Sequence, residues 1–190
     1  MQRAETLVLA GAKWDTDYLD DTSLRRLVLE QYDREHVALR RYVRFLGVED
    51  DACQDVVQES FLKLHQHLLA GGDRTNLRAW LFRVAHNVAR NRQTASPGRN
   101  EQLDKLAGVA DPVAPARESP ERKFLDRERE SVLRRAFERL STAQQQCLVL
   151  RAQGLKYREI AEVLQLSVST VAENVQRGLS ELRKVCYEAR

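Results

Sequence analysis

The sequence is poor in cysteine, proline and glycine, and it has no long hydrophobic run. Its three cysteines among 190 residues, Cys53, Cys147 and Cys186, lie far apart without CxxC or CxxxC spacing. Because an odd number at such spacing argues against a disulfide framework and against structural zinc, we expect small buried thiols and no metal site. The N-terminal apolar run is soon interrupted by Lys13 and Asp15, which disfavours a signal peptide, and no stretch approaches a membrane span. We therefore expect a cytoplasmic protein without membrane insertion.

Enzymatic motifs are also missing from the sequence. His65 and His67, two residues apart, would point to different faces of a helix, and with His36 and His86 they form no ligand set that spacing reveals. The sequence contains no phosphate-binding loop and no nucleophile motif. The pair Asp55 and Glu59, one turn apart on a predicted helix, could in principle be catalytic, but a charged docking face is the better interpretation. We therefore expect no enzyme, no catalytic residues and no cofactor.

All four prolines fall within one segment, residues 93–122, where no apolar period persists. Such a composition predicts an irregular or extended linker. The flanking segments are helical in pattern, so we expect an all-α protein with two small helical domains. The predicted boundaries are an N-terminal extension over 1–22, a first unit over 23–93, the linker over 94–122 and a second unit over 123–190.

The net charge of +3 conceals a strong local modulation. Residues 49–73 carry −5 and residues 74–92 carry +5. A protein that only coated DNA would gain nothing from an acidic block beside a basic helix, because phosphate repulsion weakens binding. The acidic block therefore predicts the docking of a basic partner.

The acidic block contains a predicted helix over about 50–69. One stripe of this helix is apolar and is expected to be buried: Cys53, Val57, Phe61, Leu64 and Leu68. The other side groups polar residues around a stranded leucine: Asp51, Asp55, Gln58, Glu59 and Leu62. An exposed leucine ringed by acids suits contact with a basic helix, although a solvated face with one stray leucine is the alternative.

The basic block contains the segment NLRAWLFRVAHNVARNR, residues 76–92, which has four arginines and no acid. At helical spacing its core stripe is Leu77, Leu81, Val84, Ala85 and Val88. The adjoining sector combines amide, guanidinium and indole groups: Asn76, Trp80, Arg83, Asn87, Arg90 and Asn91. These groups can neutralise phosphates, bond base edges and stack on bases. The alternative is a solvated basic face with Trp80 folded back onto the core.

The second unit ends in a helix-turn-helix pattern. A helix between Ser141 as N-cap and Gly154 as C-terminal stop precedes KYREIAEVLQLSVSTVAENVQRGLSELRK. The expected inward residues of the last two helices are Ile160, Ala161, Val163, Leu164, Val171, Val175, Leu179 and Leu182. The outward face of the last helix carries Ser169, Ala172, Glu173, Gln176, Arg177 and Ser180, which could enter a major groove. A structural helical hairpin is the alternative.

Taken together, the two halves resemble the extracytoplasmic-function (ECF) sigma factors of the sigma-70 family, the promoter-recognition subunits of bacterial RNA polymerase. The resemblance rests on DVVQESFLKLHQHL followed by NLRAWLFRVAHNVARNR, and on ERLSTAQQQCLVLRAQGLKYREIAEVLQLSVSTVAENVQRGLSELRK. It covers nearly the whole chain after residue 22. The order of the two halves, with a proline-bearing linker between them, is more specific than either half alone.

The resemblance implies partners and a role for each predicted face. Core RNA polymerase would bind through the clamp helices of its largest subunit and through its flap, with the acidic face as the contact. The 76–92 face and the AGGDRT loop before it would meet the opened minus-10 element and capture a flipped-out base. Residues 169–177 would read the minus-35 duplex: Ser169, Thr170, Ala172, Glu173, Gln176 and Arg177. An anti-sigma factor is a further partner that the resemblance implies.

The chain departs from the pattern of similar proteins at two places. His65 stands where relatives often have tryptophan, and the recognition helix has Ala172, Glu173 and Asn174 where basic residues are usual. The expected function is a sigma factor that brings core polymerase to promoters and promotes DNA opening. The rival interpretation is a helix-turn-helix regulator that binds duplex DNA without the polymerase.

Overall fold

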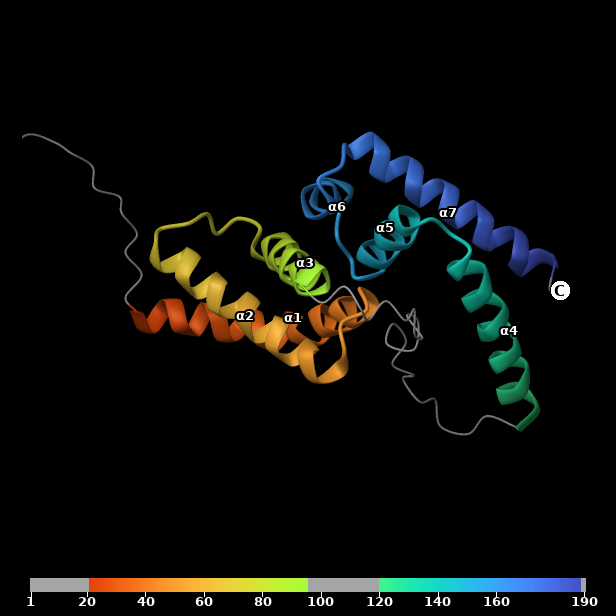
Figure 1. Ribbon diagram of the computed structural model, residues 1–190, viewed down its shortest axis with the longest axis horizontal. Coiled ribbons are helices and arrows are strands. Elements are labelled where there is room, and N and C mark those ends of the chain that lie inside the picture. Colours follow the sequence, from red (N-terminus) through yellow and green to blue (C-terminus); the bar gives the residue numbers. More distant parts are fainter. Residues whose placement is uncertain (1–20, 96–119, 189–190) are drawn as a thin grey trace, which may run out of the picture.

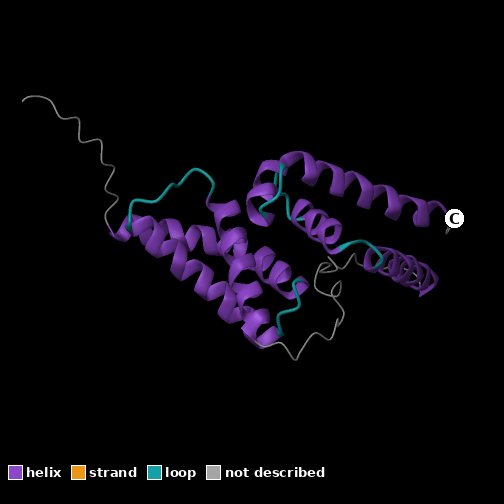
Figure 2. Ribbon diagram, turned by 45° about the horizontal axis from the view of Figure 1, so that its top comes forward, coloured by secondary structure: helices purple, strands orange, loops and turns teal. Residues whose placement is uncertain are grey.

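The computed structural model of the chain describes residues 21–95 and 120–188, with side chains over 22–93 and 129–185. Within these residues the chain forms helices and no strand (Figures 1 and 2), which confirms the predicted all-α class. The helices are α1 (Asp21–Phe45), α2 (Asp50–Leu69), α3 (Leu77–Ala95), α4 (Pro120–Glu138), α5 (Thr142–Ala152), α6 (Tyr157–Leu164) and α7 (Val168–Glu188). No described helix is long and apolar enough to cross a membrane. The predicted extension and linker lie almost entirely outside the described residues.

Helices α1, α2 and α3 pack on one another as the first group of the fold (Figure 1). The predicted apolar stripe of α2 is confirmed, since Cys53, Val57, Phe61, Leu64 and Leu68 are all buried. Burial raises the pKa of the Cys53 thiol to about 11, so the thiol stays protonated and packs as a small apolar group. Cys147 of α5 is likewise free and buried.

Helices α4 to α7 form the second group, and the predicted helix-turn-helix, α6 and α7, lies at its C-terminal end. Ser141 caps α5 through a reciprocal pair of bonds with Gln144, and Gly154 follows the helix with φ +89°, a conformation that disfavours residues with a Cβ. Between α6 and α7, Gln165 adopts φ +56° and Leu166 N–H bonds the Ala161 carbonyl at 3.0 Å. The predicted caps and turn are therefore confirmed.

The prediction for the inner face of α7 is wrong at one residue, Leu179. Leu179 is 41% exposed, whereas Val171 and Val175 are buried and Leu182 is partly buried. Gly178 occupies the buried position in that turn, and a Cβ built there would lie 2.8 Å from Leu148 Cδ1. The absence of a side chain at Gly178 allows α7 to approach α5 closely, and this rotates Leu179 outward.

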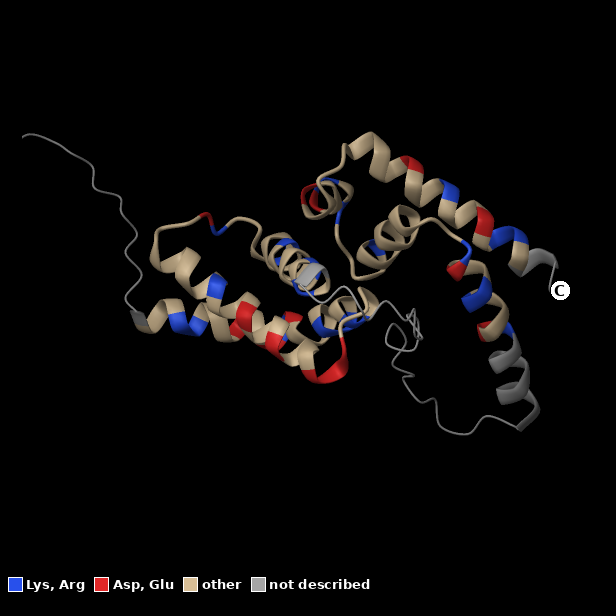
Figure 3. Ribbon diagram, in the orientation of Figure 1, with Lys and Arg blue, Asp and Glu red and all other residues tan. Residues whose placement is uncertain are grey.

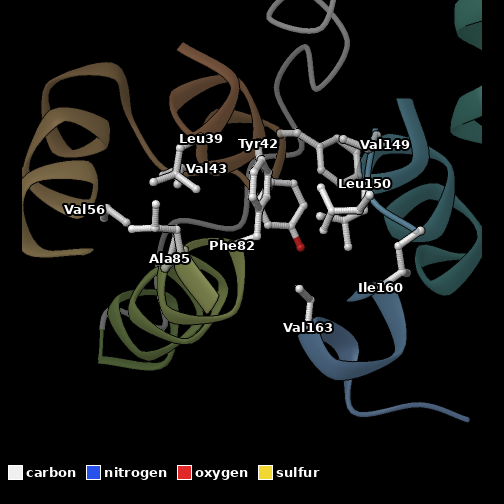
Figure 4. Close-up of a cluster of buried hydrophobic side chains, with 14 of the residues drawn as sticks. Leu39, Tyr42, Val43, Val56, Phe82, Ala85, Val149, Leu150, Ile160 and Val163 are labelled. Carbon is white, nitrogen blue, oxygen red and sulfur yellow. The ribbon is translucent and has the colours of Figure 1, made fainter. Parts of the chain in front are cut away.

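The two groups share a single buried cluster (Figure 4). Tyr42 and Phe82 from the first group lie against the part of the cluster that holds Leu150 and Ile160 of the second. The phenol ring of Tyr42 and the phenyl ring of Phe82 are almost completely buried. Helix α3 therefore buries more than its predicted stripe, because Phe82 is fully buried and packs on Tyr42, with ring centroids 5.5 Å apart. The two units that flank the predicted linker pack together in this structure.

Candidate nucleic-acid interface

The predicted docking residues lie along the outward side of α2. Asp51, Asp55, Gln58 and Leu62 are exposed, Leu62 to 64%, and Glu59 is half-buried. Acidic residues lie at the beginning and along the middle of α2 (Figure 3). The structure therefore brings together all five residues that the sequence assigned to this face.

An arginine of α3 already contacts two of these carboxylates. Arg92 Nη2 lies 3.4 Å from Glu59 Oε2, and Arg92 Nη1 lies 3.7 Å from Asp55 Oδ2. Lys63 Nζ lies 3.1 Å from the other oxygen of Glu59. Sequence reasoning missed Arg92 because the contact joins two helices, and no local spacing reveals such a pair. The acidic face is thus partly neutralised within the chain.

The predicted DNA face of α3 is divided by exposure. Asn87, Arg90 and Asn91 are exposed, Trp80 and Arg83 are half-buried, and Asn76 lies directly before the helix. Trp80 packs partly on the core, as the alternative interpretation expected, while its indole also stacks on His67. The amide and guanidinium groups over 87–91 therefore form the accessible part of this face.

The neighbouring edge of α3 has a structural role. His86 is buried, and the Tyr42 hydroxyl lies 2.8 Å from His86 Nδ1. Burial, with a smaller effect of Arg90, lowers the pKa of His86, and burial raises the pKa of Tyr42. The imidazole is therefore neutral at pH 7, and the phenol keeps its proton, so the two side chains share one hydrogen bond between neutral groups. This edge closes the core and is not available to a nucleic acid.

Arg78, at the beginning of α3, links the two groups of helices. Its Nε lies 3.2 Å from Glu35 Oε2 of α1, an ionic contact in which neither atom forms a hydrogen bond. Its Nη2 donates to the carbonyl oxygen of Gln153, in the loop after α5. Glu35 is largely buried, so the arginine compensates a carboxylate that water reaches poorly.

The predicted recognition face of α7 is held by contacts within that helix and its cap. Ser167 Oγ accepts from the Thr170 N–H at 3.0 Å and lies 2.7 Å from the Thr170 hydroxyl. Arg177 pairs with Glu173 one turn away, and the Asn174 amide donates to the Thr170 carbonyl at 2.9 Å.

Exposure differs among the six residues predicted to read the minus-35 element. Ser169, Glu173, Gln176 and Arg177 are exposed, while Thr170 and Ala172 are half-buried. The exposed four present hydroxyl, carboxylate, amide and guanidinium groups on one side of a single helix. This is a donor and acceptor set that can contact base edges in a major groove.

Two sequence families match the two groups of helices. The family described as Sigma-70 region 2 matches residues 31–95, and the family described as Sigma-70, region 4 matches residues 131–182. The RNA polymerase sigma-H factor of Pseudomonas aeruginosa is 33% identical over 156 residues, which are 79% of this chain and 80% of that protein. The ECF RNA polymerase sigma-E factor of Haemophilus influenzae is 31% identical over 164 residues, 83% of this chain and 85% of that protein.

Solved structures show the same fold. CnrH in complex with the cytosolic domain of CnrY superposes with a TM-score of 0.56 at 26% identity, covering 88% of this chain and 92% of CnrH. The sigma factor RpoE of Bartonella quintana, in complex with the anti-sigma factor NepR, gives a TM-score of 0.58 at 22% identity, covering 85% and 98%. The fold and the paired region matches define an RNA polymerase sigma factor of the sigma-70 class. The chain belongs to the ECF group of that family.

Proposed function

We propose that the α1–α3 group binds both core polymerase and the minus-10 element, and that α6 and α7 read the minus-35 element. Asp51, Asp55, Gln58, Glu59 and Leu62 of α2 contact basic helices of the polymerase. The face of α3 from Asn76 to Asn91 binds the opened strand. The chain has no covalent step of its own, because nucleotide addition belongs to the polymerase, and it works in the cytoplasm where that enzyme transcribes.

The observation that supports this assignment is the contrast between two adjacent surfaces. On α2, exposed carboxylates surround a leucine that is 64% exposed. On α3, the exposed residues Asn87, Arg90 and Asn91 are amides and a guanidinium, without any acid from 76 to 92. A basic protein surface complements the first face and a phosphate backbone complements the second.

The packed arrangement of the two groups has a consequence for promoter binding. The minus-10 and minus-35 elements are about 25 base pairs apart by their names, which is about 85 Å along B-DNA. Helices α3 and α6 are in direct contact here, so the two proposed DNA-binding groups form one packed body. We infer that the groups separate on the promoter, and that their covalent connection then raises the effective concentration of each DNA contact.

The partners of the similar structures suggest how the sigma factor is restrained. CnrH was solved with the cytosolic domain of CnrY, and RpoE with the anti-sigma factor NepR. We propose that this chain likewise has an anti-sigma factor among its partners. Co-purification of the full chain from its host, with and without core polymerase, tests this part of the proposal.

The main experiment is transcription in vitro from a genomic library by core polymerase with and without the chain. Start sites that require the chain and share motifs at minus-10 and minus-35 are the expected result. A gel shift with and without core polymerase distinguishes a sigma factor from a helix-turn-helix regulator. A sigma factor needs core polymerase for tight promoter binding, whereas an independent regulator does not. Core polymerase that stays inert on every template would overturn the proposal.

The residue assignment on α3 has its own test. Replacing Asn87 with alanine removes an exposed amide, so we expect unchanged core binding and weaker open-complex formation, measured by permanganate reactivity of unpaired thymines. Gln66→Ala on α2 removes an exposed amide one turn beyond Leu62, outside the proposed DNA face, and serves as the matched control for promoter opening. Promoter opening at the wild-type level would remove Asn87 from the DNA contacts.

A further inference from the structure

The last turn of α2 carries a histidine, His67, that contacts both the following loop and helix α3. The imidazole of His67 stacks on the indole of Trp80 in α3, with ring centroids 4.8 Å apart and an interplanar angle of 25°. His67 is half-buried, and no spacing in the sequence assigns it a role. The cluster formed by His67, Gly72, Asp73 and Trp80 is called the loop anchor below.

The loop anchor begins with the way in which α2 ends. Gly71 has φ +76°, and its N–H bonds the Leu68 carbonyl at 3.1 Å, while the N–H of Gly72 bonds the His67 carbonyl at 2.8 Å. This pair of bonds is the Schellman arrangement, in which a left-handed glycine reverses the chain after a helix. The backbone of His67 therefore holds the first residues of the loop.

The side chain of His67 holds the next residue. His67 Nε2 lies 3.1 Å from the Asp73 carbonyl oxygen. A carbonyl oxygen can only accept, so Nε2 carries the proton in this contact. The ring thus donates to the loop at its edge while its face covers one face of the Trp80 indole.

The contact of His67 with the loop requires glycine at position 72 because a larger residue would collide with the imidazole; the backbone conformation of Gly72 does not require glycine. A Cβ built on Gly72 would lie 2.1 Å from Cε1 and 2.3 Å from Nδ1 of His67, far inside van der Waals contact. An alanine at this position would displace the imidazole from its place between the loop and the indole. The chain therefore offers a substitution that moves the ring without removing it.

Asp73 connects the part of the loop held by His67 to the residues just before α3. Its carboxylate accepts from the Thr75 N–H at 2.9 Å and from the Thr75 hydroxyl at 2.8 Å. These two hydrogen bonds lower the pKa of Asp73, so the carboxylate is ionised and holds the turn at neutral pH. A continuous set of contacts thus runs from His67 through the loop to the residue before Asn76.

We propose that His67 is a positioning residue for the recognition of an unpaired base, because it fixes the 70–76 loop and the orientation of Trp80 together. The proposal rests on the proposed function, in which the face of α3 that begins at Asn76 binds the opened minus-10 strand, and on the expectation that the AGGDRT loop before α3 receives a flipped-out base from that strand. A base site discriminates among bases only when its polar groups are held in place before binding. His67 does not itself contact the DNA.

The test uses the complex of core polymerase with the full chain. Fluorescent single-stranded oligonucleotides of the non-template minus-10 sequence are titrated, with each of the four bases at every position in turn. For the wild type we expect one position at which the preferred base binds much more tightly than the others. His67→Ala and Gly72→Ala should each reduce that ratio about tenfold, the effect of losing about 1.4 kcal/mol of discrimination.

Two comparisons separate positioning from a general loss of structure. His65→Ala changes the same residue type in the same helix, two positions away, and should leave the ratio within twofold of the wild type. His67→Phe keeps a ring for Trp80 but loses the donor, and His67→Gln keeps a donor but loses the ring, so each should restore part of the ratio. A purely structural role would weaken all oligonucleotides equally and leave the ratio unchanged.

The outcomes distinguish this proposal from the proposed function. If the wild-type complex discriminates and His67→Ala discriminates equally well, the positioning role is overturned while the proposed function stands. If the wild-type complex binds none of the single strands, both fail together. Core affinity and binding to minus-35 duplex should be the same for His67→Ala, Gly72→Ala and the wild type, and a loss of either by both variants would also contradict the proposal.

Discussion

Helices α1–α3 and helices α6–α7 hold their proposed binding residues in different ways. In the first group the polar contacts cross between elements: Arg92 of α3 reaches Asp55 and Glu59 of α2, and His67 of α2 stacks on Trp80 of α3. In the second group they stay within α7 and its cap, as in the pair of Glu173 with Arg177. A substitution in the first group should therefore be felt on a second helix, and one in α7 should remain local.

The largest expected effect is on polymerase docking. Reversing the charge of Asp55, with Asp55→Arg, places a cation on the acidic face and beside Arg92. Like charges facing one another at an interface cost several kcal/mol, so affinity for core polymerase should fall on the order of 100-fold or more. Binding of the fluorescently labelled chain to core polymerase measures this.

The control for that prediction is Glu30→Arg, which reverses an exposed acid on α1 that pairs with Arg34 one turn away. It should leave core affinity nearly unchanged. Circular dichroism should show native helix content for both variants. Undiminished association of Asp55→Arg with core polymerase would refute docking through α2.

The packing of α7 gives the next largest effect. Gly178→Leu places a branched side chain where even a Cβ would lie 2.8 Å from Leu148 Cδ1. Overpacking of this kind costs about 1–3 kcal/mol, or roughly 2–4 °C of melting temperature for each kcal/mol. Thermal unfolding followed by circular dichroism measures it. Leu179→Ser, at the exposed neighbour, should shift the transition little, and the reverse order of effects would restore Leu179 to the inner face.

The contrast between Gly178 and Leu179 shows what sequence periodicity could not provide. The buried stripe of α7 follows helical spacing from Val171 and Val175 to position 178, but an apolar pattern skips a glycine and selects the neighbouring leucine. The buried stripe of α2 and the caps at Ser141 and Gly154 were predictable, because each depends on residue type at fixed local spacing. Local rules thus recover the helices and most of their inner faces.

Contacts between helices distant in the sequence were not predictable in the same way. Arg92 with Glu59, Tyr42 with His86 and Arg78 with Gln153 are separated by 33, 44 and 75 positions. No spacing rule connects such residues, because the packing of the helices alone brings them together. For the candidate site, the residues that line each face could therefore be predicted, whereas the residues that hold those faces in place could not.

Loss of Arg78 tests the contact between the two groups. Arg78→Ala removes the ion pair to Glu35 and the donor to the Gln153 carbonyl. We expect a cost of about 1–2 kcal/mol, less than for a fully buried pair because the Arg78 side chain is 38% exposed and solvent screens it. Small-angle scattering should show a larger radius of gyration. Arg158→Ala, an exposed arginine on α6, should change neither property, and an unchanged radius for Arg78→Ala would show that apolar packing alone joins the groups.

A change on α7 should be confined to duplex binding. Glu173→Ala removes a carboxylate that phosphates repel and releases Arg177 from its pair. Affinity for minus-35 duplex should rise about threefold. The slope of the logarithm of the binding constant against the logarithm of salt concentration should steepen by about one, the contribution of one added phosphate contact. Fluorescence anisotropy over a salt series measures both. Weaker binding, confined to sites with a cytosine at one position, would instead identify Glu173 as a direct reader of that base.

The smallest expected effect concerns the arginine that crosses from α3 to α2. Arg92→Ala leaves Asp55 without this partner and leaves Glu59 with Lys63 alone, so the acidic face becomes more negative toward a basic helix. Because the Arg92 side chain is 39% exposed and surface ion pairs contribute about 0–1 kcal/mol, core affinity should rise by about twofold or less. The gain should vanish at high salt, where exposed charges are screened. Weaker core binding by Arg92→Ala would show instead that Arg92 holds the two carboxylates in the geometry that the polymerase recognises.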